Sequence, residues 1–375
     1  MIIMNLKLDN VLAFSNFNIN FSYPMKLRKS FFDDENINGI SSFRYKKLNI
    51  FLGANASGKT SLMKCIWAIL AFLKNKEAVV LNEIINKKYL KSSIEIDFVD
   101  TIDNQNYLKR IKILTDNSNN KRPLMSYNSL KISSGDSYES MVKDLDLKDD
   151  NYIDYLECLN NNPIGSGWHT ILPATEQGFD FIRFTNVPNK EKQEEYTHIL
   201  NQVLKTLDPS IINVSKSLDA NNAYVIEHEN EKIIIQEGNR ISGIKLLSSG
   251  TKYGINIANI MFSIKNHLNG IYIIDEQFSY VNSDVEIAMI TTMANMLGPN
   301  EQLFITTHNS NILDVKFPFH SFNFLRKEIM DERSVITSSC ASLVENRNNV
   351  SPKTIVDNDM LSTAPNVNRI FELGE

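Results

Sequence analysis

Eight consecutive residues, Gly53 to Thr60, have the types and spacing that hold a phosphate group. They read Gly-Ala-Asn-Ala-Ser-Gly-Lys-Thr, a match to G-x-x-x-x-G-K-[ST]. Gly53 and Gly58 carry no side chain, so the backbone can wrap closely around phosphate oxygens. Lys59 would reach the β- and γ-phosphates of a nucleotide, and the Thr60 hydroxyl would ligate Mg²⁺. The residues that we expect at the phosphates are Gly53, Asn55, Ala56, Ser57, Gly58, Lys59, Thr60 and Ser61.

Two adjacent acids follow an apolar run in the last third of the chain. The run 271–274 reads Ile-Tyr-Ile-Ile and predicts a buried strand, and Asp275 and Glu276 come directly after it. Carboxylates at the carboxyl end of a parallel strand lie where α/β sheets bind their ligands. We therefore expect Asp275 to hold Mg²⁺ and Glu276 to orient and polarise an attacking water.

A second apolar run, 302–305, ends in Thr306-Thr307-His308. The spacing of 32 residues from Glu276 to His308 leaves room for one helix, which we expect over 284–297 with Ser283 as its cap. Strand, helix and strand then form a β-α-β unit. This unit would place His308 beside the phosphate end of the neighbouring strand.

The elements that must position these residues follow from the apolar pattern. Residues 48–52 predict a buried strand directly before the glycine loop, and residues 60–73 predict an almost wholly apolar helix directly after it. Alternation over 2–21 predicts two strands, and 93–99 with 107–114 predicts a further pair. Strand, glycine loop and helix are the context that a phosphate-binding loop requires.

The segment 246–252 reads Leu-Leu-Ser-Ser-Gly-Thr-Lys and precedes a further helical stretch. Taken alone, Ser248 or Ser249 would be explained as a helix cap. The order of glycine loop, this segment, Ile-Ile-Asp-Glu and Thr-Thr-His resembles the ATP-binding-cassette (ABC) ATPases. Asn55 in the loop, and Ser-Ser-Gly-Thr in place of the transporter sequence LSGGQ, resemble more narrowly the soluble class of SMC- and OLD-related ATPases. The resemblance covers about residues 1–115 and 210–330.

This resemblance implies an α/β fold, the ABC-ATPase head, with a mixed or parallel sheet, flanking helices, an antiparallel β subdomain and a mixed, mainly helical insert. It also implies ATP and Mg²⁺ as cofactors. Ser248, Ser249 and Gly250 would contact the γ-phosphate of ATP held by the loop of a second subunit. Two chains would then enclose two nucleotides.

The remaining roles are implied by the same resemblance. Glu276 would be the catalytic carboxylate, His308 the switch histidine that senses the γ-phosphate, and Lys59 a further catalytic group. Gln177 is the candidate for the glutamine that ligates Mg²⁺ beside Thr60 and Asp275. Gln277 stands where a proline is common after the two acids, which leaves the shape of that loop open.

These motifs divide the chain into four segments. We expect the N-terminal half of the head at 1–115, the insert at 116–210, the C-terminal half of the head at 211–330 and a tail at 331–375. The net charge of −5 implies no general polyanion-binding surface, and three widely spaced cysteines form no disulfide framework. Without a run long enough to span a bilayer or a secretion signal, we expect a cytoplasmic protein.

Two functions fit these motifs. The first is a regulatory ATPase, a homodimer or larger even-numbered oligomer, that controls a separate effector such as a nuclease or toxin in a bacterial anti-phage system. Its insert and its tail, 350–375, would dock the partner. The alternative is an SMC-like clamp in DNA repair or recombination, with Lys109, Arg110 and Lys112 of a basic stretch on the nucleic acid.

Overall fold

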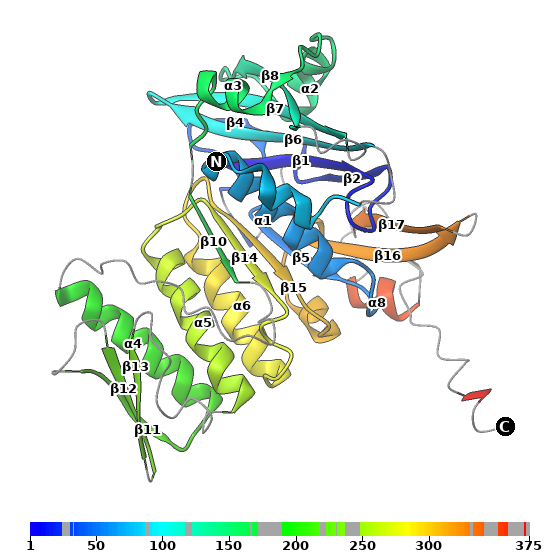
Figure 1. Cartoon of the computed structure of the whole chain (residues 1–375). Coiled ribbons are helices and arrows are strands. Elements are labelled where there is room, and N and C mark those ends of the chain that lie inside the picture. The colour runs from blue at the N-terminus through cyan, green and yellow to red at the C-terminus, as the bar shows by residue number, and fades with distance from the viewer. Residues whose placement is uncertain are drawn as a thin grey trace.

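The computed structural model describes residues 1–24, 31–32, 34–86, 91–116, 122–165, 167–171, 190–217, 223–229, 231–236, 248–330, 333–340, 352–358 and 371–372. Two six-stranded sheets dominate the described part of the chain, and helix α1 lies between them (Figure 1). None of the described helices combines the length and the apolar character that crossing a membrane requires.

The central sheet has the strand order β10-β14-β15-β5-β16-β17. Its strands are β5 (Leu48–Leu52), β10 (Trp168–Ile171), β14 (Ile271–Asp275), β15 (Gln302–Thr306), β16 (Phe322–Met330) and β17 (Arg333–Cys340). The first five strands in this order are parallel, and β17 returns antiparallel to β16. Every residue of β5, β14 and β15 is buried, as expected for parallel strands covered on both faces.

One face of the central sheet packs on α1 (Lys59–Asn75) and, beyond it, on the antiparallel sheet β2-β1-β6-β7-β8-β9. The strands of that sheet are β1 (Ile2–Asp9), β2 (Phe17–Asn20), β6 (Lys91–Ile102), β7 (Gln105–Asp116), β8 (Leu124–Lys131) and β9 (Ile153–Asp154). Because side chains alternate along a strand, Phe51 of β5 joins the core around α1, whereas Ile50 joins the core on the opposite face.

The opposite face packs on α5 (Ser249–Lys265) and α6 (Ser283–Met296). Helix α4 (Lys190–Leu207) covers α5 and carries the three-stranded sheet β11-β12-β13 on its far side (Figure 1). The remaining elements are β3 (Asn36–Ile37), β4 (Ile40–Arg44), η1 (Ala78–Glu83), α2 (Tyr138–Asp146), α3 (Tyr155–Asn161), β11 (Ile211–Lys216), β12 (Ala223–His228), β13 (Glu231–Gln236), η3 (Ser310–Asp314), η4 (Phe319–Ser321) and α8 (Pro352–Asp357).

Segment 116–210 has mixed secondary structure and contributes to several layers. Strands β8 and β9 extend the antiparallel sheet, β10 joins the edge of the central sheet, and α4 packs on α5. The sequence pattern did not predict these three strands. The division of the chain at 115/116 and at 210/211 into two halves of the head and an insert stays a prediction.

The cap predicted for α6 is wrong by one residue. The helix begins at Ser283, and the Asn282 side chain accepts a hydrogen bond from the Asp284 N–H at 2.8 Å. Asn caps a helix as well as Ser does, and its position before Ser283 leaves the Ser283 hydroxyl available for the segment after β15.

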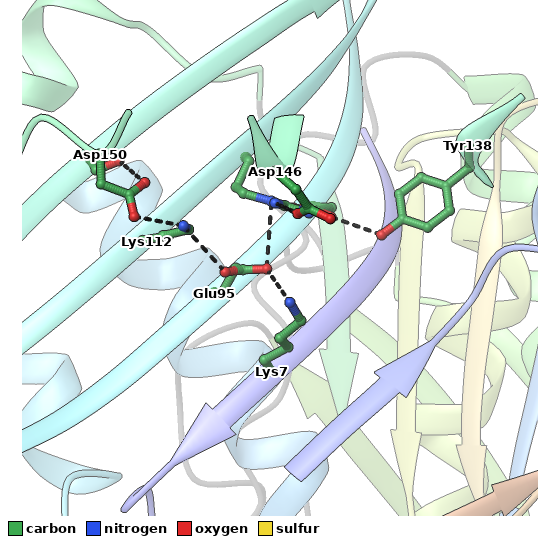
Figure 2. Close-up of polar contacts among 9 residues, drawn as sticks. Lys7, Glu95, Lys112, Tyr138, Asp146 and Asp150 are labelled. Carbon is green, nitrogen blue, oxygen red and sulfur yellow. Dashed lines mark hydrogen bonds and ion pairs between the residues drawn. The ribbon is translucent and has the colours of Figure 1, made fainter. Parts of the chain in front are cut away.

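The proposed DNA contacts of β7 are wrong for Lys109 and Arg110, because both side chains are buried in ion pairs. The Arg110 guanidinium donates to both carboxylate oxygens of Asp97 at 2.7 Å, and Lys109 Nζ lies 2.7 Å from Asp100 Oδ2. Figure 2 shows the surrounding network of charged groups, in which Lys112 contacts Glu95 and Asp150. These cations therefore neutralise carboxylates of the same chain.

Candidate functional site

The carboxyl ends of β5, β14 and β15 meet at one edge of the central sheet. Strand β15 pairs in parallel with β14 on one side and with β5 on the other. The glycine loop follows β5, Asp275 ends β14, and His308 lies two residues beyond β15. The structure thus brings together Lys59, Asp275, Glu276 and His308, as the topology of a parallel sheet requires.

The glycine loop has a backbone that only selected residues adopt. Gly58 and Ala56 have φ angles of 100° and 62°. The Lys59 ammonium is folded over its own loop, where it donates to the carbonyl oxygens of Gly53 at 2.9 Å and Ala54 at 3.3 Å. Burial lowers the pKa of Lys59, and the carboxylates of the site oppose that shift. A cation that donates to carbonyl oxygens of its own loop can exchange them for phosphate oxygens.

Both glycines pack closely against the β16–β17 hairpin, and at Gly53 the neighbour is backbone. A Cβ atom on Gly53 would lie 2.3 Å from the carbonyl oxygen of Leu325, and one on Gly58 would lie 2.4 Å from Cδ1 of Ile336. Contacts this short do not occur, so a side chain at Gly53 would displace the loop from the backbone of β16. The glycines therefore serve the packing of the loop as well as the approach of a ligand.

Asp275 is fully buried, and its environment fits a magnesium ion. Thr306 Oγ1 donates to its Oδ1 at 2.6 Å, and the Thr60 hydroxyl lies beside the same carboxylate. Burial is the largest effect on Asp275 and raises its pKa to about 6, while both hydroxyls oppose the shift. Among the described residues its Oδ2 has no hydrogen-bond partner.

A buried carboxylate oxygen without a partner, next to a hydroxyl, provides the hard oxygen ligands that Mg²⁺ prefers. Over the described ranges there is no cluster of three or more His, Cys, Asp and Glu that would form a complete metal cage. A magnesium ion at Thr60 and Asp275 would therefore complete its shell with waters and substrate phosphates, which is its usual behaviour at nucleotide sites.

The backbone of Glu276 is left-handed, with a φ angle of 49°, so the chain turns away from the direction of β14 at this residue. Its N–H donates to Thr306 Oγ1 at 2.9 Å, and its Oε1 lies 3.1 Å from Nε2 of His308. Both side chains are partly exposed and line a cavity of about 560 Å³, to which Asn55 of the glycine loop also contributes. The geometry suits a base and a polar partner that face a water molecule beside a phosphate.

Thr306 is a site residue that the sequence motifs did not predict. Its hydroxyl joins the two acids, because it donates to Asp275 and accepts from the N–H of Glu276. The sequence contains a signal for this role, because Thr306 ends a buried, mainly apolar strand and is followed by a second hydroxyl residue, Thr307. Glu286 of α6, which lines the same cavity, was missed as well.

The serine segment before α5 lies away from the glycine loop of the same chain. Ser248 caps α5, since its Oγ accepts from the Thr251 N–H at 3.1 Å, and it is exposed. A Cβ atom on Gly250 would lie 3.0 Å from the carbonyl oxygen of Tyr280, so this segment packs on the turn after β14. Helices α5 and α1 belong to cores on opposite faces of the central sheet.

Three further sequence predictions concern Gln177, the serine segment and Gln277. Gln177 lies outside the described residues, as do positions 246 and 247, and the side chain of Ser249 is not described. Gln277, which directly follows the two acids, is buried. Its Nε2 donates to the carbonyl oxygen of Asp275 at 3.0 Å, and its Oε1 accepts from Asn256 of α5. An amide thus holds the turn after the two acids in place of a proline ring.

No protein-family model and no curated protein matches this sequence. Solved structures do match. One is an SMC head domain bound to the C-terminal winged-helix domain of ScpA, with a TM-score of 0.50, 14% identity and coverage of 91% of this chain and 98% of that chain. Another is an SMC head domain with an extended coiled coil, bound to the C-terminal domain of ScpA derived from Pyrococcus furiosus. Its TM-score is 0.50 at 13% identity, and the match covers 91% of this chain and 97% of that chain.

The fold is therefore that of the ABC-type ATPases, and the predicted fold class is confirmed. Within that class, the solved structures that it resembles are SMC heads. At 13–14% identity the likeness is one of fold, so the activity has to be argued from the site itself.

Proposed function

We propose that this protein binds ATP with Mg²⁺ and hydrolyses it. The observation that supports this most strongly is the convergence of Lys59, Asp275, Glu276 and His308 at one edge of the sheet. The fold likeness to SMC heads supports the same conclusion. Phosphoryl transfer depends on positioning and on neutralising charge, and these four side chains supply both.

Each group has a separate task in this proposal. The N–H groups of the loop and of the first turn of α1 face the phosphates. Lys59 exchanges its two carbonyl partners for phosphate oxygens, and Thr60 with Asp275 holds Mg²⁺. The bound ion neutralises phosphate charge. Glu276 accepts a hydrogen bond from the attacking water, and His308 contacts both Glu276 and the γ-phosphate.

Lys59→Ala tests the binding step. We expect ATP affinity to fall by about 10- to 100-fold, because a charge-assisted hydrogen bond contributes roughly 1.5–3 kcal/mol. Calorimetric titration with ATP and Mg²⁺ measures the effect. Lys64→Ala, on the exposed side of the same helix, is the matched control and should bind like the wild type. Equal affinities in the two variants would contradict the proposed phosphate contact.

We further propose that the site is completed by a second copy of the chain. Ser248 and Gly250 lie on the face of the sheet opposite α1, so the serine segment of one subunit is available to the ATP of another. Tyr280, which packs beside Gly250, is two-thirds exposed and stacks on Tyr253. ATP would then hold two subunits together until it is hydrolysed.

Ser248→Arg tests this arrangement. We expect unchanged ATP binding by the isolated chain and a roughly tenfold or larger loss of hydrolysis, because a bulky cation removes one donor to the transferred phosphate across the interface. The rate of phosphate release measures the effect. The control is Ser41→Arg, a change at an exposed position of β4.

Mixing the Lys59→Ala and Ser248→Arg proteins tests the shared site more directly. A heterodimer of Lys59→Ala and Ser248→Arg chains has one site with both changes and one site with neither. Mixing the two variants should therefore restore part of the activity. Lost ATP binding by Ser248→Arg alone, or no recovery on mixing, would contradict the shared site.

The finer proposal is that the ATPase regulates a separate effector, such as a nuclease or toxin of an anti-phage system. Two observations support a protein partner. The similar SMC heads are bound to domains of ScpA, which is a separate protein. In this chain the described part of the tail, α8, packs on η3, with Lys353 Nζ 2.6 Å from Asp314 Oδ2. Because η3 follows His308 directly, a partner on the tail would lie close to the site.

Co-purification tests the effector. The protein should retain a second protein encoded beside it, and deletion of 350–375 should abolish that association while ATP hydrolysis persists. Retention of the partner by the shortened chain would contradict the tail as a docking surface. The DNA clamp has lost its specific support, since Lys109 and Arg110 are buried.

A further inference from the structure

Helix α6 buries a single carboxylate on its apolar face. Glu286 is 3% exposed and shares that face with Met289, Ile290 and Met293. Burial of a carboxylate is costly unless it is hydrogen-bonded, and burial raises the pKa of Glu286 for that reason. The hydrogen-bond partners of the Glu286 carboxylate therefore show which part of the chain it holds in place.

The two partners of Glu286 lie on either side of His308. Its Oε1 accepts from Thr307 Oγ1 at 2.5 Å, and its Oε2 accepts from Asn309 Nδ2 at 2.9 Å. The Asn309 N–H donates to Thr307 Oγ1 at 2.9 Å, and Asn309 Oδ1 accepts from Ser283, also on α6, at 3.0 Å. The backbone of 307–309 is thus attached to α6 by a closed set of hydrogen bonds.

His308 itself has no such support. Its side chain is 41% exposed, and its Nε2 lies 3.1 Å from Glu276 Oε1. The position of the imidazole therefore depends on where the backbone of 307–309 is held.

We propose that Glu286 is a positioning residue that acts through His308: by fixing Thr307 and Asn309, it sets the distance between the imidazole and the catalytic carboxylate Glu276. This inference rests on the proposed ATPase function. It adds that one carboxylate on α6 governs the hydrolysis step through the segment that carries His308.

Glu286→Gln tests the proposal with little change of volume. A Gln amide has one acceptor oxygen in place of two. If its Nε2 faces Asn309 Nδ2, itself a donor, that bond is lost; if its Nε2 faces Thr307 Oγ1, the hydroxyl has to accept instead of donate. We expect kcat to fall by about 10- to 100-fold with KM and ATP affinity unchanged, which is the effect of misplacing a group by about 1 Å. Thr307→Val, which removes the bond from Thr307 Oγ1, should act in the same direction.

A double-mutant cycle separates positioning from general damage. In a His308→Ala background, Glu286→Gln should lower kcat no further, because its effect passes through the missing ring. Glu301→Gln is the matched control. Glu301 is also buried and also contacts a histidine, His267, but it lies before β15 and therefore at the opposite edge of the sheet. It should lose stability and keep kcat.

Histidine-selective ¹⁵N NMR gives a readout that does not need activity. The His308 signal, assigned by its loss in His308→Ala, should shift in Glu286→Gln and stay in place in Glu301→Gln. An unmoved His308 signal, an unchanged kcat, or an equal further loss in the His308→Ala background would each overturn the proposal. A wild-type protein that binds no ATP would instead refute the proposed function, and the NMR result would still decide the role of Glu286.

Discussion

Glu276→Gln should give a protein that binds ATP and no longer turns it over. The amide has nearly the same size and can keep the 3.1 Å approach to His308 Nε2, so the cavity should retain its shape. It cannot accept a proton from the attacking water. We expect hydrolysis to fall by on the order of 10²- to 10⁴-fold, the usual contribution of a positioned base, with ATP affinity within a factor of a few of the wild type.

Phosphate release and the nucleotide content of the purified protein measure the two parts of this result. Lys59→Ala provides the contrast, because it should lose binding as well as turnover. Native mass spectrometry of Glu276→Gln with ATP and Mg²⁺ should show an even-numbered assembly that retains ATP. Wild-type turnover by Glu276→Gln would exclude Glu276 as the catalytic carboxylate, and an ATP-bound monomer would count against the shared site.

Arg110→Ala should destabilise the protein by about 3–5 kcal/mol, because it leaves the carboxylate of Asp97 buried without its cation. The guanidinium holds Asp97 with two bonds, and Tyr138 of α2 donates to the same carboxylate at 2.7 Å. Arg110 also contacts Asp146 at the end of α2. Its loss should therefore loosen α2 from the antiparallel sheet, and denaturant-induced unfolding should detect a lower midpoint.

The matched control is Arg122→Ala beside the same sheet. Arg122 is 70% exposed and lies 3.8 Å from Asp154, so its removal should cost about 0–1 kcal/mol. Similar unfolding midpoints for the two variants would show that the Arg110 network contributes little. The same experiment bears on the DNA clamp, since a variant that unfolds cannot report on DNA contacts.

The site was largely predictable because its signals are local. Each of β5, β14 and β15 is a short, mainly apolar run that ends in a polar residue or directly before the glycine loop, and parallel strands bring such ends together. Thr306 and Glu286 were missed because their importance depends on a partner distant in the chain. A buried acid on an apolar helix face was nevertheless visible at Glu286, at helical spacing from Met289, Ile290 and Met293.

The error at β7 arose from treating basic residues as surface residues. The hairpin was predicted, but its register was not, because strand ends at 99 and 107 would place Asp97 opposite Lys109. The observed strands extend to 102 and 105, and their register places Asp97 opposite Arg110 and Glu95 opposite Lys112. Strands β8 and β10 were harder to predict, because β8 is rich in polar residues and β10 is a four-residue strand at a sheet edge.

The position of β5 in the central sheet has a consequence for synthesis. Its two neighbours, β15 and β16, come more than 250 residues later in the chain. Contacts of such long range are slow to form, whereas β6 and β7 follow each other in the sequence and pair across a short turn. A nascent chain therefore carries the complete glycine loop early and can fix it in the sheet only after residues 303–324 have been synthesised. Until then the exposed edges of β5 are open to unwanted strand pairing, and early protection by a chaperone would benefit this segment most.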